Sequence, residues 1–246
     1  MTFNVNLRSL TLLFLVPLTI PWHTNAQTVS TETGMIKAYL YQLFGTDESL
    51  VTGTLYIGPA RGSIEGSPFF IDSRWKTGSV RVENRVFDDV SLRYDVEINQ
   101  FILSCATATL NNVQIGLRST AIERITMEDR VFIPMPLSTD STIITYAELL
   151  SEGKINYLVT RKKYLVLTNG SGMTDYIYRE IIKQYLWYNN ELVNFRRKSD
   201  LLDLLPGLKS EINQHTRQNR LKYKRKNLTD RALIIDYCNS ILNQQQ

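Results

Sequence analysis

The chain is poor in the residues that build metal and disulfide sites. Its 246 residues include 2 His and 2 Cys, and no HExxH, CxxC or EF-hand spacing occurs. These counts exclude a disulfide-rich scaffold and a common zinc module. The glycines at 53, 58, 62 and 66 lack the order of a P-loop or of a dinucleotide-binding loop. We therefore expect no metal and no cofactor, and we assign no catalytic residue.

Strong charge of one sign and long apolar runs are also missing. The chain has 28 Lys and Arg against 24 Asp and Glu, a formal net charge of +4, and 43% of its residues are hydrophobic. This composition excludes a wholly disordered chain, a collagen and a coiled coil. Beyond residue 26 no segment approaches the roughly 20 apolar residues that span a bilayer. We predict no transmembrane segment in the mature chain.

Residues 1–26 have the features of a secretory signal peptide. Arg8 precedes a short apolar run over residues 10–20, and Pro17 and Pro21 argue against a buried N-terminal helix. Ala26 stands at the expected cleavage point, so Gln27 would be the first mature residue. We expect a periplasmic or secreted protein. Export permits a disulfide between Cys105 and Cys238, but both lie in apolar stretches and we favour two buried thiols.

The body, residues 27–195, is predicted to be rich in strands. Apolar and polar residues alternate over 90–98, which places one face of a strand in a core. Residues 101–109 read as the returning strand of a hairpin, with turns at 99–100 and 111–112. Further hairpins are expected over 155–168, with a turn at the basic residues 161–163, and over 186–195. Tyr146, Leu149 and Leu150 have helical spacing and predict a short helix ending near residue 153.

Residues 196–246 are predicted to be helical and basic. They carry 11 basic and 5 acidic residues, against 16 and 19 in residues 27–195. Ser199, Pro206 and Asn227 are expected to begin three helices. Apolar stripes are predicted at positions 208, 212 and 215, and at 232, 235, 238 and 242. The fold class we expect is α+β, an antiparallel strand-rich body with short helices and this C-terminal segment packed on it.

Several short motifs occur in a recognisable order. They are GTLY at 53–56, EGSPFF at 65–70, GSV at 78–80, VSLRYD at 90–95 and YAELLSEG at 146–153. This order resembles a group of exported Bacteroidota proteins that has no established activity. The resemblance implies a compartment and a lineage, and no reaction. In such bacteria the run from Asp140 to Thr142 is similar to the acceptor motif for O-glycosylation, which makes Ser141 a candidate site.

Few groups in the mature chain could carry catalysis. His215 is the only histidine left after residue 26, and its helical spacing favours packing against the core. The adjacent acidic pairs at 47–48, 88–89 and 128–129 are typical of solvated loops. A carboxylate pair from separate strands would still permit a hydrolase acting on glycans or peptides, which we keep as an alternative.

The basic run at 217–226 is the sharpest non-catalytic feature. It has six positive charges in ten residues and no acid, and the candidate anion-binding residues are Arg217, Arg220, Lys222, Lys224, Arg225 and Lys226. A solvated connection between two helices is the interpretation we favour, and contact with an anionic surface is the alternative. A second basic group stands at 196–198. Because export separates the protein from nucleic acid, we do not expect that partner.

The leading functional hypothesis is a non-enzymatic, exported binding or envelope-associated module. Its partner would be an envelope protein, a glycan or an anionic surface. The chain has 3 Trp, 13 Tyr and 9 Phe, which could stack on sugars or anchor an interface if exposed. For the densest groups, around Trp75 and at 185–188, we predict core packing because aromatics are enriched in strands.

Overall fold

The computed structural model describes residues 54–58, 64–105, 113–117, 122–135, 145–170 and 173–244. Within these ranges the strands form one 12-stranded sheet in the order β1-β6-β5-β4-β3-β7-β8-β9-β10-β11-β12, and β2 pairs with β11. The pairing is antiparallel throughout except between β2 and β11. The strands are β1 (Thr54–Leu55), β2 (Ile64–Glu65), β3 (Lys76–Val82), β4 (Arg85–Asp95), β5 (Gln100–Cys105), β6 (Val113–Gly116), β7 (Ile122–Met127), β8 (Arg130–Pro134), β9 (Tyr146–Ser151), β10 (Ile155–Gly170), β11 (Met173–Tyr188) and β12 (Glu191–Asn194).

Strands β3 to β8 share a first hydrophobic core. The alternating positions from Val90 to Val96 are buried, as their spacing predicts. Ile98 is instead 54% exposed. The reason is that β4 ends earlier than expected and the chain turns back before β5, with Asn99 at a φ of 55°. Aromatic contacts fill this core, including Tyr94 stacked on Phe101 with ring centroids 4.3 Å apart.

The helix predicted over residues 146–153 is wrong, because this segment is strand β9. The sequence of β9 shows no alternation of apolar and polar residues, because apolar clusters cover both faces of the strand. Tyr146 belongs to the first core, and Leu150 packs against a second core. Ala147 and Leu149 lie on the opposite face, in a third apolar cluster. An apolar stretch packed on both sides gives no period of two.

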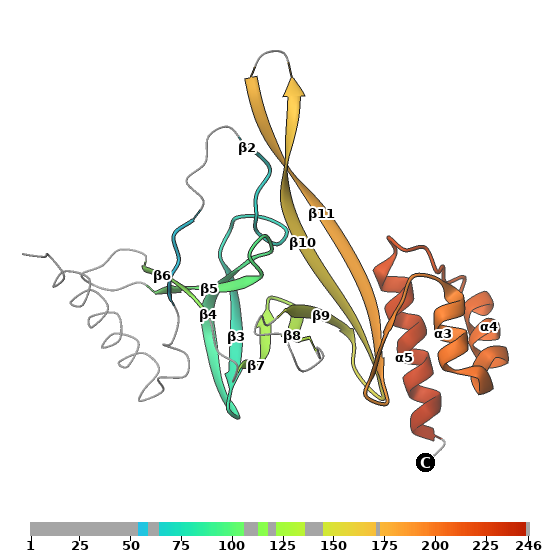
Figure 1. Cartoon of the computed structure of the whole chain (residues 1–246). Coiled ribbons are helices and arrows are strands. Elements are labelled where there is room, and N and C mark those ends of the chain that lie inside the picture. Colours follow the sequence, from blue (N-terminus) through green and yellow to red (C-terminus); the bar gives the residue numbers. More distant parts are fainter. Residues whose placement is uncertain are drawn as a thin grey trace, which may run out of the picture.

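The turn predicted at residues 161–163 is also wrong. These residues lie inside β10, which pairs with β11 from Ile155 to Gly170 as one long twisted hairpin (Figure 1). Arg161 and Lys163 have partners in the middle of the strand, and Lys162 is exposed. The Arg161 guanidinium bonds to Glu148, and the Lys163 ammonium donates to the carbonyls of Ser67 and Phe69. The hairpin predicted over 186–195 is confirmed as β11 and β12, with a turn at Asn189 and Asn190.

Two cores lie on one face of the sheet, with buried charge between them. Glu148 of β9 is directly opposite Phe132 of the first core and Val159 of the second. Cross-strand partners share a face, so both cores are on the side of Glu148. Glu148 is 2% exposed and pairs with Arg130 and with Arg161, whose Nη2 lies 3.1 Å from Oε2. An ionic cluster thus separates two apolar regions of a continuous surface.

The C-terminal helices cover the base of the long hairpin, where they form the second core with β10, β11 and Phe195, which follows β12 (Figure 1). They are α3 (Lys198–Leu204), the 3₁₀ turn η1 (Pro206–Leu208), α4 (Lys209–Gln218) and α5 (Leu228–Gln244). Pro206 opens η1, and the Asn227 side chain accepts the backbone N–H of Asp230 at 3.1 Å, as expected of a cap. Ser199 lies inside α3 rather than before it, because Arg197 takes the N-cap position.

The fold is α+β in the sense predicted from the sequence, with strands more extensive than helices. Within the described ranges, none of the helices is both long and apolar enough to cross a bilayer.

Candidate functional site

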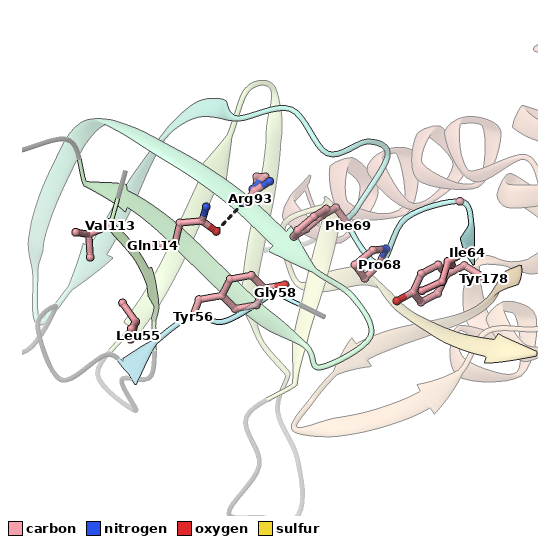
Figure 2. A pocket seen from close by; sticks show the side chains of 11 residues that line it. Leu55, Tyr56, Gly58, Ile64, Pro68, Phe69, Arg93, Val113, Gln114 and Tyr178 are labelled. Atoms are coloured by element: carbon pink, nitrogen blue, oxygen red, sulfur yellow. Dashed lines mark hydrogen bonds between the residues drawn. The ribbon is translucent and has the colours of Figure 1, made fainter. Parts of the chain in front are cut away.

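An open cleft of about 640 Å³ lies between the edge of the sheet at β1 and β6 and the long hairpin (Figure 2). The pairing of β2 with β11 holds residues 64–70 between these two parts of the sheet. A bridge between Phe69 and Asp95 fixes the same segment to β4. The described lining residues are Leu55, Tyr56, Gly58, Ile64, Gly66, Pro68, Phe69, Arg93, Val113, Gln114 and Tyr178. They are mostly apolar or aromatic, and none of them is acidic.

Arg93 is the charged group of this cleft, and aromatic rings hold it. Its guanidinium carbon lies 3.9 Å from the centroid of the Trp75 ring and 4.3 Å from that of Phe69. Nη2 donates to Oε1 of Gln114 at 2.9 Å, and Nη1 donates to the carbonyl of Ser73 at 3.1 Å. Burial lowers the pKa of Arg93, and the ring faces favour a cation at this place.

The Nε–H of Arg93 is a buried donor that has no acceptor among the described residues. Burying a donor without an acceptor costs free energy. The other two guanidinium nitrogens are held by Gln114 and Ser73, so the arginine is fixed in orientation. Arg93 is therefore a cation held in a fixed orientation at the cleft.

Two tyrosines that line the cleft donate hydrogen bonds to carboxylates. The Tyr56 hydroxyl donates to Oδ2 of Asp95 at 2.7 Å, and the Tyr178 hydroxyl donates to Oε2 of Glu97 at 2.8 Å. Oδ1 of Asp95 also accepts the backbone N–H groups of Glu97 and Ile98. Burial raises the pKa of Asp95 despite these bonds, and burial together with the Asp95 bond raises the pKa of Tyr56. These bonds fix the tyrosine rings, so the cleft has rigid aromatic walls.

The described acidic pairs that the sequence predicts to be solvated are exposed to solvent in the structure. Asp88 and Asp89 are exposed on β4, and Glu128 and Asp129 are exposed in the turn between β7 and β8. Residues 47–48 lie outside the described residues. Among the residues that the structure describes, His, Cys, Asp and Glu side chains nowhere gather in a group of three or more that could hold a metal.

His215 and Cys238 have packing roles. The His215 ring stacks on Tyr237 with centroids 3.7 Å apart, which agrees with the helix-face position predicted. Cys238 is a free, fully buried thiol, and burial raises its pKa to about 12. A thiol with so high a pKa is a poor nucleophile. The side chain of Cys105 lies outside the described residues.

The basic run forms the connection between two helices that the sequence analysis favours. Only its first residues belong to α4, and residues 219–227 connect α4 to α5 outside any helix. All six candidate anion-binding residues are exposed, while Leu221 and Tyr223 between them pack against the second core. The structure also brings Arg225 of this run to the same cavity as Arg196 of the second basic group. The sites predicted at Ala26, Gln27 and Ser141 lie outside the described residues.

The sequence did not point to the cleft residues. Arg93 and Asp95 occupy the polar positions of an alternating strand, which predicts solvent exposure. Asp95 is instead 1% exposed, because the segment at Phe69 pairs with it. The aromatics predicted to pack do so in part. Trp75 stacks on Arg93, and the group at 185–188 packs against the second and third apolar clusters.

No family model matches the chain, and no curated protein or solved structure is significantly similar to it.

Proposed function

We propose that the protein is an exported, non-enzymatic binding module that takes a saccharide of the cell envelope in the cleft at Arg93. The cleft combines fixed aromatic rings with an arginine and an amide, which is the chemistry that stacks on a sugar ring and bonds its hydroxyls. The observation that carries the proposal is the orientation of Arg93 between Phe69 and Trp75. Export to the periplasm or beyond, in a bacterium of the Bacteroidota, is part of the same proposal.

The walls of the cleft support binding rather than hydrolysis. Its described lining includes no carboxylate, and the nearby Asp95 and Glu97 are held by tyrosine hydroxyls. A glycosidase needs two carboxyl groups on either side of the scissile bond. We therefore prefer binding over the hydrolase alternative.

A binding assay against a panel of defined oligosaccharides, neutral and uronate-containing, tests this proposal. Phe69→Ala removes an aromatic wall that also stacks on Arg93. We expect the variant to bind about fivefold more weakly, since a stacked aromatic contact contributes on the order of 1 kcal/mol. Tyr164→Ala is the matched control, because Tyr164 is 40% exposed on the long hairpin and does not line the cleft.

Binding that Phe69→Ala weakens and Tyr164→Ala leaves unchanged supports the proposal. No binding to any member of the panel, or an equal loss in both variants, contradicts it. Thermal unfolding of each variant without ligand shows whether the fold is intact.

A further inference from the structure

We propose that Lys183, Arg196 and Arg225 form a second site, which binds a phosphate group. The three residues come from β11, from the segment after β12 and from the connection between α4 and α5. They line a cavity of about 320 Å³ together with Ile181, Gln184, Asn194 and Phe195. This cavity shares no described lining residue with the cleft at Arg93, so the site is independent of saccharide binding.

The cavity exists because β12 ends while β11 continues. The last contact between them is the Phe195 backbone N–H donating to the Gln184 carbonyl at 2.8 Å. Beyond it the chain leaves the sheet at Arg196, and the edge of β11 is open. The Arg225 guanidinium reaches this edge and donates from Nη2 to the carbonyl of Ile182 at 3.0 Å.

Arg225 is held in place from its backbone as well. The Nε2 of Gln184 donates to the Arg225 carbonyl at 2.7 Å, and the Tyr157 hydroxyl donates to Oε1 of the same Gln184 at 2.7 Å. Gln184 is only 4% exposed, so this arrangement is rigid. A positioned guanidinium loses less conformational entropy on binding a ligand than a mobile one does.

The acidic group nearest in sequence is Asp200, and its carboxylate is engaged by backbone donors. Asp200 accepts the backbone N–H groups of Arg196 and Arg197 at 2.7 and 2.9 Å, and Arg197 Nε lies 3.4 Å away. Burial by itself would raise the pKa of Asp200, but these bonds outweigh it and hold the pKa below its usual value. Asp200 lines an adjoining cavity with Arg196 and Arg197, and it does not line the one at Arg225.

A buried cation behind the cavity adds to the positive field. Arg231 is 0% exposed, and its guanidinium carbon lies 3.7 Å from the ring centroid of Phe195, which lines the cavity. Its Nε and Nη1 have no acceptor among the described residues. Charge that is buried and unpaired is screened little by salt, so it favours an anion nearby.

Guanidinium forks and an ammonium are the groups that proteins use for phosphate oxygens. The phosphate could belong to a free anion or to a lipid headgroup, which share this chemistry. Lys222, Lys224 and Lys226 are exposed on the same connection as Arg225 and would contact a bilayer only in the second case.

Titration with inorganic phosphate tests the site. We expect phosphate to raise the thermal unfolding midpoint of the protein. Arg196→Gln and Lys183→Gln should each weaken that binding about tenfold, because each removes a charged hydrogen-bond donor to the phosphate. Lys162→Gln is the control, since it removes the same charge at an exposed position of β10 that does not line the cavity. The midpoint of each variant without phosphate reports on its fold.

Cosedimentation with vesicles distinguishes the two sources. Vesicles of phosphatidylcholine with and without phosphatidylglycerol are compared at low salt. Phosphate binding that depends on Arg196 and Lys183, without vesicle binding, supports a free phosphate. Vesicle binding that Arg196→Gln weakens and Lys162→Gln does not supports a headgroup. If Lys162→Gln weakens binding equally, or if neither probe depends on Arg196, the proposed site is overturned.

Discussion

Asn239 of α5 bonds to both backbone groups of Ile155 in β10. Its Oδ1 accepts the Ile155 N–H at 2.8 Å, and its Nδ2 donates to the Ile155 carbonyl at 2.9 Å. The side chain thus takes the place that a neighbouring strand would have at the start of the long hairpin. A Cβ on Gly153 would lie 2.5 Å from the Asn239 side chain, so the same contact explains a glycine there.

We predict that Asn239→Ala lowers the free energy of unfolding by about 3 kcal/mol. The change leaves two buried backbone groups without partners, and each costs on the order of 1–3 kcal/mol. Urea denaturation measures the effect. Asn243→Ala, at an exposed position of the same helix, should change it by less than about 0.5 kcal/mol. Equal effects of the two changes would contradict this role of Asn239.

The ionic cluster between the two cores gives a second prediction. Glu148→Gln should destabilise the protein by about 3 kcal/mol, because it leaves Arg161 and Arg130 without their buried counter-charge. Glu152 pairs with Arg124, but its side chain is 58% exposed. Glu152→Gln should therefore lower the free energy of unfolding by at most about 1 kcal/mol. Urea denaturation of the two variants compares them. If the Glu148→Gln and Glu152→Gln variants have the same free energy of unfolding, the charge pairs of Glu148 do not stabilise the protein.

Asp95 should make stability depend on pH in an unusual direction. Its pKa is raised in the folded protein, mainly by burial. The folded state therefore binds the proton more tightly than the unfolded state, and stability is lost as pH rises through the raised pKa. We expect Asp95→Asn to flatten this fall, measured as the free energy of unfolding from pH 4 to pH 7. If the free energy of unfolding of Asp95→Asn falls with pH as steeply as that of the wild type, another group causes the fall.

Arg231 gives a prediction about buried charge. Its pKa is lowered by burial, and two of its donors lack acceptors among the described residues. Arg231→Met keeps most of the apolar volume and removes these costs, so we expect its free energy of unfolding to stay within about 1 kcal/mol of the wild type or to rise. Arg231→Ala also leaves a cavity and should cost about 3 kcal/mol. If thermal or urea denaturation finds Arg231→Met and Arg231→Ala equally destabilised, the charge of Arg231 itself stabilises the packing of the helices.

The parts of the fold that the sequence predicts correctly are set by local patterns, such as a strand with one buried and one exposed face. The alternation from Val90 to Val96 and the cap at Asn227 are set by local rules and are confirmed. Strand β9 and the middle of β10 were not predicted, because contacts with residues distant in sequence determine their strand conformation. Leu149 and Leu150 are covered on opposite faces, and the charge of Arg161 is met by Glu148.

The candidate sites were harder to predict than the fold. The two cavities join residues far apart in sequence, such as Tyr56 with Tyr178, and Lys183 with Arg225. No spacing along one chain indicates such pairs. The basic groups at 196–198 and 217–226 were visible in the sequence, but their meeting at one cavity depends on where β12 ends.

Amide hydrogen exchange, measured with and without an oligosaccharide of the panel, tests whether a saccharide binds in the cleft at Arg93. We expect slower exchange in peptides covering residues 64–75 and 113–117, which form the cleft and hold Arg93. Peptides of α5 should be unchanged. Protection confined to the helices or to the distal hairpin, with none at the cleft, would contradict the claim.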